Sequence, residues 1–291
     1  MIKYLGSITL LLALSINFAM MTGFAPAASA EDSLSNESRN VLLLQDINRA
    51  ILGLERHGLE SSHYYAQFTK ALSESEDSLV NFLGTVMADL RFGVTRKELN
   101  ARQRITLERL VYGTKQQENI AQYWQRTAAR HPTYEPLQMA LEQYQHIAKQ
   151  GGWESIPSSK KLALGTEDER VPLIRERLRS SADYSGSKDQ TLMFDAALEN
   201  AVKNYQNRHG LSADGVIGPK TLASMNVPVS KRIEQLSMSL ERLRRMPDLQ
   251  DNRYVQVNVP SYKLFGYEGQ RNVLKIDVIV GKTSRPTPLF D

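Results

Sequence analysis

The spacing of apolar residues changes near residue 250 from the period of helices to that of strands. Up to Met246, apolar side chains recur every three or four residues, as on an amphipathic helix. In Arg253–Val259 and Asn272–Gly281, apolar and polar residues alternate, as along a strand. The pattern predicts a mainly α chain followed by a short β region, with two strands joined through the turn-rich segment 267–272.

The first 30 residues have the features of a secretory signal peptide. Lys3 precedes an uncharged apolar stretch from Leu5 to Ala25, and Ala28–Ala30 is a small-x-small cleavage site. The stretch is of borderline length for a membrane anchor, so an uncleaved anchor is the alternative. We expect residues 1–30 to be removed and the protein to be periplasmic, with no membrane partner after cleavage.

Composition excludes several classes of function. The 291 residues carry a formal net charge of +4, and their basic residues are interleaved with acidic ones, unlike the concentrated basic face of a nucleic-acid-binding protein. The chain has no cysteine, which excludes disulfides, cysteine-ligated zinc and a thiol nucleophile. We identify no metal motif, no cofactor motif and no catalytic residue.

Residues 31–160 are predicted to form an irregular helical scaffold. Thr95 and Glu98 have the spacing of a capping box before a helix. Pro132 and Pro136 are expected to separate one helix from the next. If this region binds a protein partner, a surface around Tyr123–Trp124 is the candidate.

Residues 161–228 are predicted to form a compact module of three helices, which we call the three-helix module. A cluster of Gly, Pro and Ser at Gly151–Ser159 marks its beginning. The segments Asp168–Leu178 and Asp214–Met225 both contain an acidic residue, a short linker, a proline and a helix-like run. This repeated pattern predicts two similar halves that pack on each other.

Residues 229–250 are predicted to form a connecting amphipathic helix with Ser230 as its N-cap. Its predicted apolar face consists of Ile233, Leu236, Leu240 and Leu243. Residues 251–291 form the β region. Because two strands are rarely stable by themselves, we expect this region to be the beginning of a larger domain in a truncated or partial chain; a complete hairpin docked on the helices is the alternative.

Four segments follow one another along the second half of the chain: "VKNYQNRHGLSADGVIGPKTLASMNVP", "RIEQLSMSLERLR", "VNVPSYKLF" and "VIVGKTSRPTP". In this order they resemble the large periplasmic L,D-transpeptidases of Gram-negative bacteria. The resemblance runs from about Leu162 to the end of the chain. It implies a helical scaffold, a peptidoglycan-binding domain at 161–228, and the N-terminal part of a catalytic domain at 251–291.

The resemblance also implies a catalytic mechanism whose key residues are missing from this sequence. In that family, a cysteine thiolate within an S-x-G-C motif attacks the donor stem peptide, and a nearby histidine acts as base. This chain has neither cysteine nor that motif, and its five histidines all precede the β region. We therefore expect it to be catalytically inactive as given, associated with peptidoglycan through its glycan strands or stem peptides, and a candidate partner of cell-wall synthesis proteins.

Candidate peptidoglycan-binding residues lie in and around "HGLSADGVIGPKTLASMN" (His209–Asn226). This stretch is not a phosphate-binding loop, because Pro219 follows Gly218 where such a loop has lysine. Its glycines are expected to end a helix and to form turns, and any role in ligand binding is secondary. The candidates are Tyr184, Phe194, Tyr205, Arg208, Asp214, Gly215 and Gly218.

Several of these candidates have a structural alternative. Helical spacing favours a core position for Phe194 and Tyr205, and Arg208 is more often a solvated cation. For the whole chain, the alternative to a portion of an L,D-transpeptidase is a stand-alone, non-enzymatic peptidoglycan-binding, scaffold or adaptor protein.

Overall fold

The computed structural model describes residues 43–116, 119–128, 131–186, 190–246, 253–269, 271–281 and 284–285. The predicted signal peptide lies outside these residues. The chain divides into two compact units, residues 1–49 and 50–291; the described part of the first, residues 43–49, is helical. No helix within the described ranges is long and apolar enough to cross a membrane.

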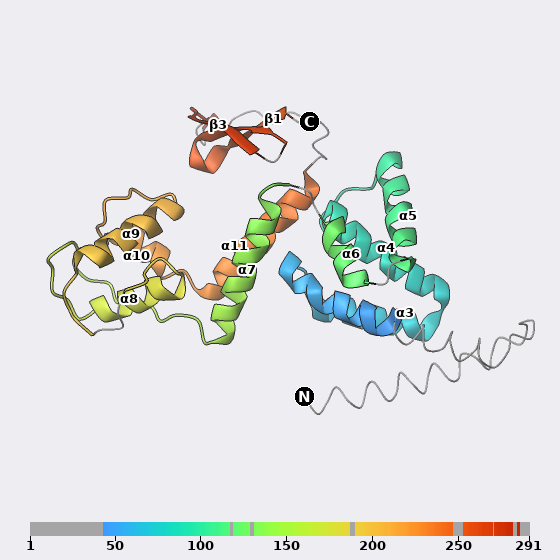
Figure 1. The fold of residues 1–291 in the computed structure, drawn as a ribbon, viewed down its shortest axis with the longest axis horizontal. Helices are drawn as coiled ribbons and strands as arrows, with labels where there is room; N and C mark the ends of the chain where they lie inside the picture. Colours follow the sequence, from blue (N-terminus) through green and yellow to red (C-terminus); the bar gives the residue numbers. More distant parts are fainter. Residues whose placement is uncertain are drawn as a thin grey trace, which may run out of the picture. The chain divides into compact units, whose positions relative to one another are not determined.

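The second unit is mainly helical, as predicted (Figure 1). Its helices are η1 (Leu54–His57), α3 (Ser61–Glu74), α4 (Glu76–Phe92), α5 (Ala101–Lys115), α6 (Ile120–Thr127), α7 (Tyr134–Lys149), α8 (Val171–Ser180), α9 (Ala196–Arg208), α10 (Pro219–Met225) and α11 (Val229–Arg245). A small antiparallel sheet follows, with strands β1 (Arg253–Asn258), β2 (Lys263–Glu268) and β3 (Arg271–Asp277), and the short helix η2 (Val259–Ser261) lies between β1 and β2.

The capping box predicted at Thr95 and Glu98 is wrong. The helix begins later, and its capping box consists of Asn100 and Gln103, each accepting a hydrogen bond from the other's backbone N–H. The backbone N–H of Thr95 instead donates to the Glu241 carboxylate on α11 over 2.8 Å. Thr95 therefore makes a tertiary contact with α11 and does not cap a helix, as the local sequence pattern predicted it would.

Two other predicted helix boundaries also differ. Pro136 does not break a helix; it lies in the first turn of α7, where the missing N–H group has no intrahelical acceptor to lose. Ser230 is not an N-cap, because α11 already begins at Val229 and its N-cap residue is Pro228. The fixed φ angle of a proline suits it to a helix start, and here it replaces the expected serine.

Helix α11 packs along α7 through the apolar face that its sequence predicts. Leu240 is fully buried against Leu141 and Tyr134 of α7, and Ile233, Leu236 and Leu243 pack around this cluster. The helix is therefore a part of the helical core as well as a connection. Since α7 precedes the three-helix module and α11 follows it, the module is an insertion between two helices that pack on each other.

A buried polar network strengthens this packing. Arg244 donates through Nη1 to the backbone oxygen of His57 over 2.7 Å and to the hydroxyl of Tyr134 over 2.9 Å, and through Nη2 to Glu241 over 2.9 Å. Arginine can only donate, so the Tyr134 hydroxyl oxygen accepts from Arg244, and this hydroxyl also lies within hydrogen-bond distance of His57 Nδ1, 3.1 Å away. The network joins η1, α7 and α11 without leaving Arg244 unpaired.

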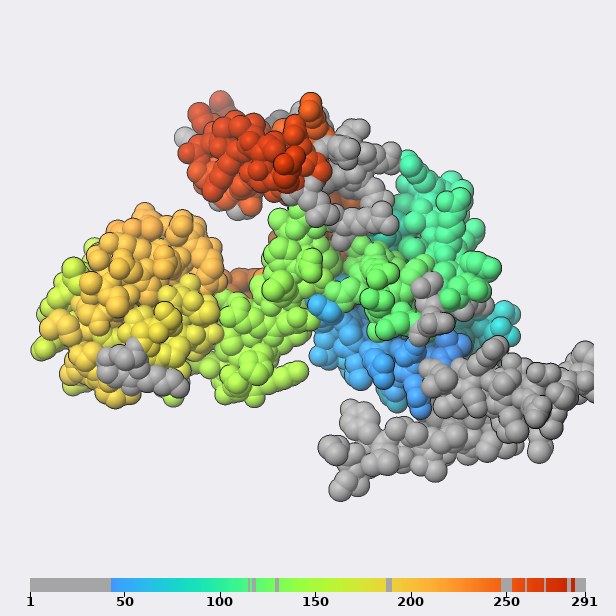
Figure 2. Space-filling model, in the orientation of Figure 1, coloured from blue at the N-terminus to red at the C-terminus, as the bar shows by residue number. Residues whose placement is uncertain are grey.

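The segments that enter and leave the three-helix module are tied to each other. The side chain of Asn226 accepts from the backbone N–H of Ile156 over 2.8 Å and donates to its carbonyl over 2.9 Å. Nearby, the indole N–H of Trp153 donates to the Val227 carbonyl over 3.2 Å. Figure 2 shows the module, coloured yellow to orange, as a closely packed body.

The sheet has three strands in the order β1-β2-β3, whereas the alternation predicted two. Strand β2 was missed because Gly266 interrupts its apolar pattern; a Cβ atom there would come within 2.9 Å of the Leu274 Cβ. The register places Val255, Val257, Leu264, Leu274 and Ile276 on one face. Of these, Val255 is 68% exposed and Ile276 is 45% exposed, so the sheet carries an accessible apolar face.

Candidate functional site

The core of the three-helix module contains three of the aromatic residues proposed as ligand contacts. Phe194 and Tyr205 have no exposed surface, and Tyr184 is 6% exposed. They pack with apolar residues of α8, α9 and α10: Val171, Ile174, Leu178, Leu198, Val202, Leu222 and Met225. Phe194 and Tyr205 therefore offer no surface to a ligand. They occupy core positions, which was the structural alternative that helical spacing favoured.

The loop before α10 is held by Gln206, a residue that the sequence did not single out. Its Nε2 donates to Asp214 Oδ1 over 2.8 Å and to the Val216 carbonyl over 3.0 Å, and its Oε1 accepts from the Gly215 N–H over 2.9 Å. The Val216 N–H also donates to Asp214 Oδ1 over 2.9 Å. This backbone hydrogen bond, followed by that from Gln206, lowers the pKa of the Asp214 carboxyl.

The glycines of this loop serve different purposes. Gly215 has a φ of +76°, and a Cβ atom there would lie 2.7 Å from the Cγ atom of Glu199. Gly218 has a φ of −93°, and the nearest atom to a Cβ there, on Lys161, would be 4.0 Å away. Gly215 is therefore required by the backbone, as expected, whereas Gly218 is not.

The repeated pattern in the module has a local structural counterpart. Asp168 accepts a hydrogen bond from the backbone N–H two residues later, at Arg170, over 2.9 Å. Asp214 makes the same bond with Val216. Both are short side-chain turns that precede a proline-initiated helix. Backbone pairing between Leu162 and Ile217 connects the two halves.

Arg208 lies at the surface, at the end of α9. Its guanidinium group pairs with Asp183, with an Nη2–Oδ2 distance of 2.5 Å, and contacts the Tyr144 hydroxyl at 3.4 Å. Burial opposes its charge, but the hydrogen bonds to Asp183 and Tyr144 outweigh this effect and raise the pKa of Arg208. Its side chain is still 42% exposed, so Arg208, like the exposed Asp214, is a predicted candidate with a charged group that solvent reaches.

Helix α8 contributes two buried arginines that periodicity alone did not identify. Arg175 donates to the carbonyls of Thr191 and Met193 and to the Asp195 carboxylate. Arg177 donates to the Met225 carbonyl, and its guanidinium carbon lies 3.6 Å from the ring centre of Trp153. The signal available in the sequence was that Arg175 and Arg177 flank Glu176 next to the apolar residues that form the buried side of α8.

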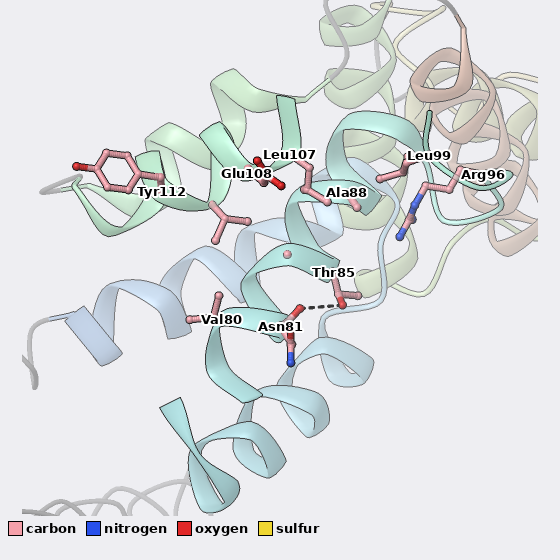
Figure 3. A pocket seen from close by; sticks show the side chains of 11 residues that line it. Val80, Asn81, Thr85, Ala88, Arg96, Leu99, Leu107, Glu108 and Tyr112 are labelled. Carbon is pink, nitrogen blue, oxygen red and sulfur yellow. Dashed lines mark hydrogen bonds between the residues drawn. The ribbon is translucent and has the colours of Figure 1, made fainter. Parts of the chain in front are cut away.

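A separate cleft of about 660 Å³ lies between α4 and α5. Val80, Thr85 and Ala88 of α4 line it together with Leu107 and Tyr112 of α5 (Figure 3). The charged groups at this cleft are Arg96 and Glu108. It contains none of the residues predicted to bind peptidoglycan. Within the described ranges, no group of three or more His, Asp or Glu side chains could hold a metal ion.

The family described as "Putative peptidoglycan binding domain" matches residues 167–225. The chain contains a peptidoglycan-binding domain. The match spans α8, α9 and α10, together with the loop that Gln206 holds. The peptidoglycan-binding domain therefore coincides with the buried core that surrounds Tyr205.

A second comparison concerns a longer protein. The "Putative L,D-transpeptidase" of Haemophilus influenzae is 34% identical over 121 residues. The aligned segment is 39% of this chain and 24% of that relative, so the similarity spans about a quarter of the relative's length. With the peptidoglycan-binding domain, this match confirms the relationship to the L,D-transpeptidase family that the sequence segments predicted.

Proposed function

We propose that this chain is an exported, periplasmic protein that associates with peptidoglycan through residues 161–228. The observation that carries the proposal is the family match at 167–225 to a segment with its own buried core. A shallow, preformed surface suits a long polar polymer better than a deep cavity does. The predicted signal peptide at residues 1–30 would supply the export.

We further propose that the chain is the N-terminal portion of an L,D-transpeptidase involved in cell-wall cross-linking or remodelling. The relative of that name and the ordered segments that resemble the family support this assignment. Residues 1–291 contain no cysteine, so they supply no thiolate to form an acyl-enzyme. On this proposal, these residues position the protein on its substrate, and residues 251–291 belong to the catalytic domain.

The candidate contact residues fall into two groups by their exposure to solvent: exposed residues that can contact the polymer and buried residues that shape the domain. We propose that Arg208 and Asp214 present polar groups to the polymer, with the backbone around Gly218 and the edge of Tyr184 beside them. Phe194, Tyr205 and Gly215 would act through the shape of the domain, because they are buried.

The alternative is a stand-alone, non-enzymatic protein that either binds peptidoglycan or acts as a scaffold or adaptor for a protein partner. The surface first suggested for a protein partner is less suitable than expected, because Trp124 is 2% exposed and lies in the core. Ile105 and Tyr112 on α5 are 51% and 68% exposed and offer a better contact for a cell-wall synthesis protein.

Co-sedimentation with purified sacculi tests the main proposal. The full chain should pellet with sacculi at low and moderate salt and stay in solution without them. The adaptor alternative predicts that the chain stays in the supernatant in both cases. A transpeptidation assay on the same preparation, with a stem-peptide donor, should show no release of D-alanine by these 291 residues.

A further inference from the structure

Three arginines and a histidine surround Tyr205, where the peptidoglycan-binding domain contacts α7 and α11. We call Arg177, Arg208, His209 and Arg232 the basic cluster. The guanidinium carbons of Arg177 and Arg208 each lie 5.7 Å from the Tyr205 ring centre, and the His209 ring centre lies 4.1 Å from it. Arg232 donates to Ser224 Oγ over 3.1 Å, and Ser224 Oγ lies 2.9 Å from the Tyr205 hydroxyl.

The charges of the basic cluster are not balanced within the described part of the chain. Asp183 is the carboxylate that pairs with Arg208. Neither Arg177 nor Arg232 forms an ion pair with a described residue. An arginine cannot release its proton to escape burial, so Arg177, whose side chain is almost fully buried, keeps its charge without a carboxylate partner.

Hydrogen-bonding groups of the cluster are also unused. Arg177 Nη2, Arg232 Nε and His209 Nε2 have no hydrogen-bond partner among the described residues. Burial, followed by the charges of Arg208 and Arg232, lowers the pKa of His209 to about 4. The neutral ring adds no positive charge and can still donate one N–H group.

The neighbouring Arg175 shows how this domain neutralises the charge of a buried arginine that has only a structural role. It lies two residues before Arg177 on α8, and it is paired with the Asp195 carboxylate and two backbone carbonyls. Buried charges are normally paired in this way. The absence of such a partner for Arg177 and Arg232 points to an anion supplied by a ligand.

We propose that the basic cluster binds a free carboxylate of a peptidoglycan stem peptide, with Arg232 as the direct contact. Arg208 contributes a neighbouring positive charge, because its Nε and Nη2 already donate to Asp183. This inference rests on the proposed function. Planar guanidinium groups match carboxylates with two parallel hydrogen bonds, whereas uncharged sugar hydroxyls would leave the excess charge unbalanced. Arg208 is the accessible edge of the cluster, and Arg177 lies beneath it as a fixed positive charge.

The proposal is tested with the full chain and a synthetic tripeptide of L-alanine, γ-linked D-glutamate and diaminopimelate, measured by calorimetry. The control ligand is the same tripeptide with its carboxylates amidated. The double variant R208Q/R232Q should raise the Kd of the tripeptide about tenfold or more, because one charge-assisted contact and one neighbouring positive charge are lost. The amidated tripeptide should bind the unaltered chain at least about tenfold more weakly than the free acid.

Two further variants separate recognition from folding. R232Q alone leaves the Arg208–Asp183 pair intact and should still weaken tripeptide binding about threefold or more. K220Q removes the charge of an exposed lysine on α10 and should leave the Kd unchanged. Thermal melting of each variant checks that the domain remains folded.

Equal affinities of the unaltered chain and R232Q for the tripeptide would overturn the proposal. Equal binding of the free and amidated peptides, or no binding of the tripeptide at all, would overturn it as well. Each of these outcomes can occur while the chain still pellets with sacculi, in which case the glycan strands would be recognised instead. Failure to pellet with sacculi would reject the proposed function itself.

Discussion

Gln206 and Asp214 are joined by a hydrogen bond of 2.8 Å from the amide Nε2 to the carboxylate Oδ1. Gln206 is 1% exposed, and its amide oxygen accepts from the next residue, Gly215. One buried side chain therefore fixes both sides of the turn that leads into α10. The glycine-rich stretch before α10 resembles a ligand-binding loop in the sequence, but in the structure it forms a turn that Gln206 holds in place.

Removing this amide should destabilise the domain. We expect Gln206→Ala to lower the free energy of unfolding by about 2–4 kcal/mol, because buried donors and acceptors around the turn lose their partner. Asn207→Ala, at the exposed next position on α9, should change it by less than about 0.5 kcal/mol. Urea unfolding of both variants measures the difference; equal stabilities would show that the turn holds without Gln206.

The two loop glycines provide a matched pair. Gly215→Ala should cost about 1–3 kcal/mol, because alanine is strained at a positive φ and its Cβ would press on Glu199. Gly218→Ala should be neutral or slightly stabilising, since its backbone is extended and the space is free. Melting temperatures of the two variants test this; a larger loss for Gly218→Ala would contradict the assignment.

Much of the helical fold could be predicted from the sequence, because helix periodicity is a local property. Two features agree with it: Pro172 and Pro219 lie in the first turns of α8 and α10, and α11 has the predicted apolar face. The errors arose where a tertiary contact decided the outcome. Thr95 caps no helix because Glu241, distant in sequence, binds it, and β2 was missed because Gly266 breaks the alternation to make room for Leu274.

The candidate site was less predictable than the fold. An aromatic residue on a helix can face the core or a ligand, and only packing decided that Phe194 and Tyr205 face the core. Two residues that hold this region together, Gln206 and Arg177, are polar residues in buried positions. A sequence pattern gives no signal for partners that are 10 or 48 residues away, as the Gln206–Val216 and Arg177–Met225 bonds are.

The buried network around Arg244 should dominate the stability of the α7–α11 packing. Arg244→Ala should lower the free energy of unfolding by about 3–5 kcal/mol, because Glu241, Tyr134 and the His57 carbonyl lose a common donor. Arg242→Ala, on the exposed side of the same helix, should cost less than about 0.5 kcal/mol. Chemical denaturation followed by circular dichroism compares the two, and similar losses would contradict a special role for Arg244.

Acid should weaken the fold through His57. Burial, followed by the charges of Arg244 and Arg56, lowers the pKa of His57 from 6.5 to about 3. Between these values the unfolded chain binds a proton that the folded chain does not, so stability is lost as the pH falls through this window, by up to about 1.4 kcal/mol per pH unit.

His57→Gln removes this titration. Its free energy of unfolding should therefore fall less steeply than that of the unaltered chain between about pH 6 and pH 4. Denaturation series at several pH values measure both slopes. Parallel profiles for the two proteins would mean that His57 does not contribute to the acid sensitivity.

The apolar face of the sheet should limit solubility. Val257 and Ile276 are 46% and 45% exposed on this face, and exposed apolar patches favour association. We expect Val257→Thr with Ile276→Thr to slow aggregation in light scattering at equal concentration, while the β-branched residues keep strand propensity. Unchanged aggregation would indicate that another surface controls it.

The most direct test of the central claim is to locate the surface that binds peptidoglycan. Hydrogen exchange of the full chain should be measured by mass spectrometry with and without soluble muropeptides. We predict added protection at the end of α9 and in the 211–218 loop, within residues 167–225, and none in α4 or α5. Protection confined to α4 and α5, or no protection anywhere, would contradict the assignment of peptidoglycan binding to this domain.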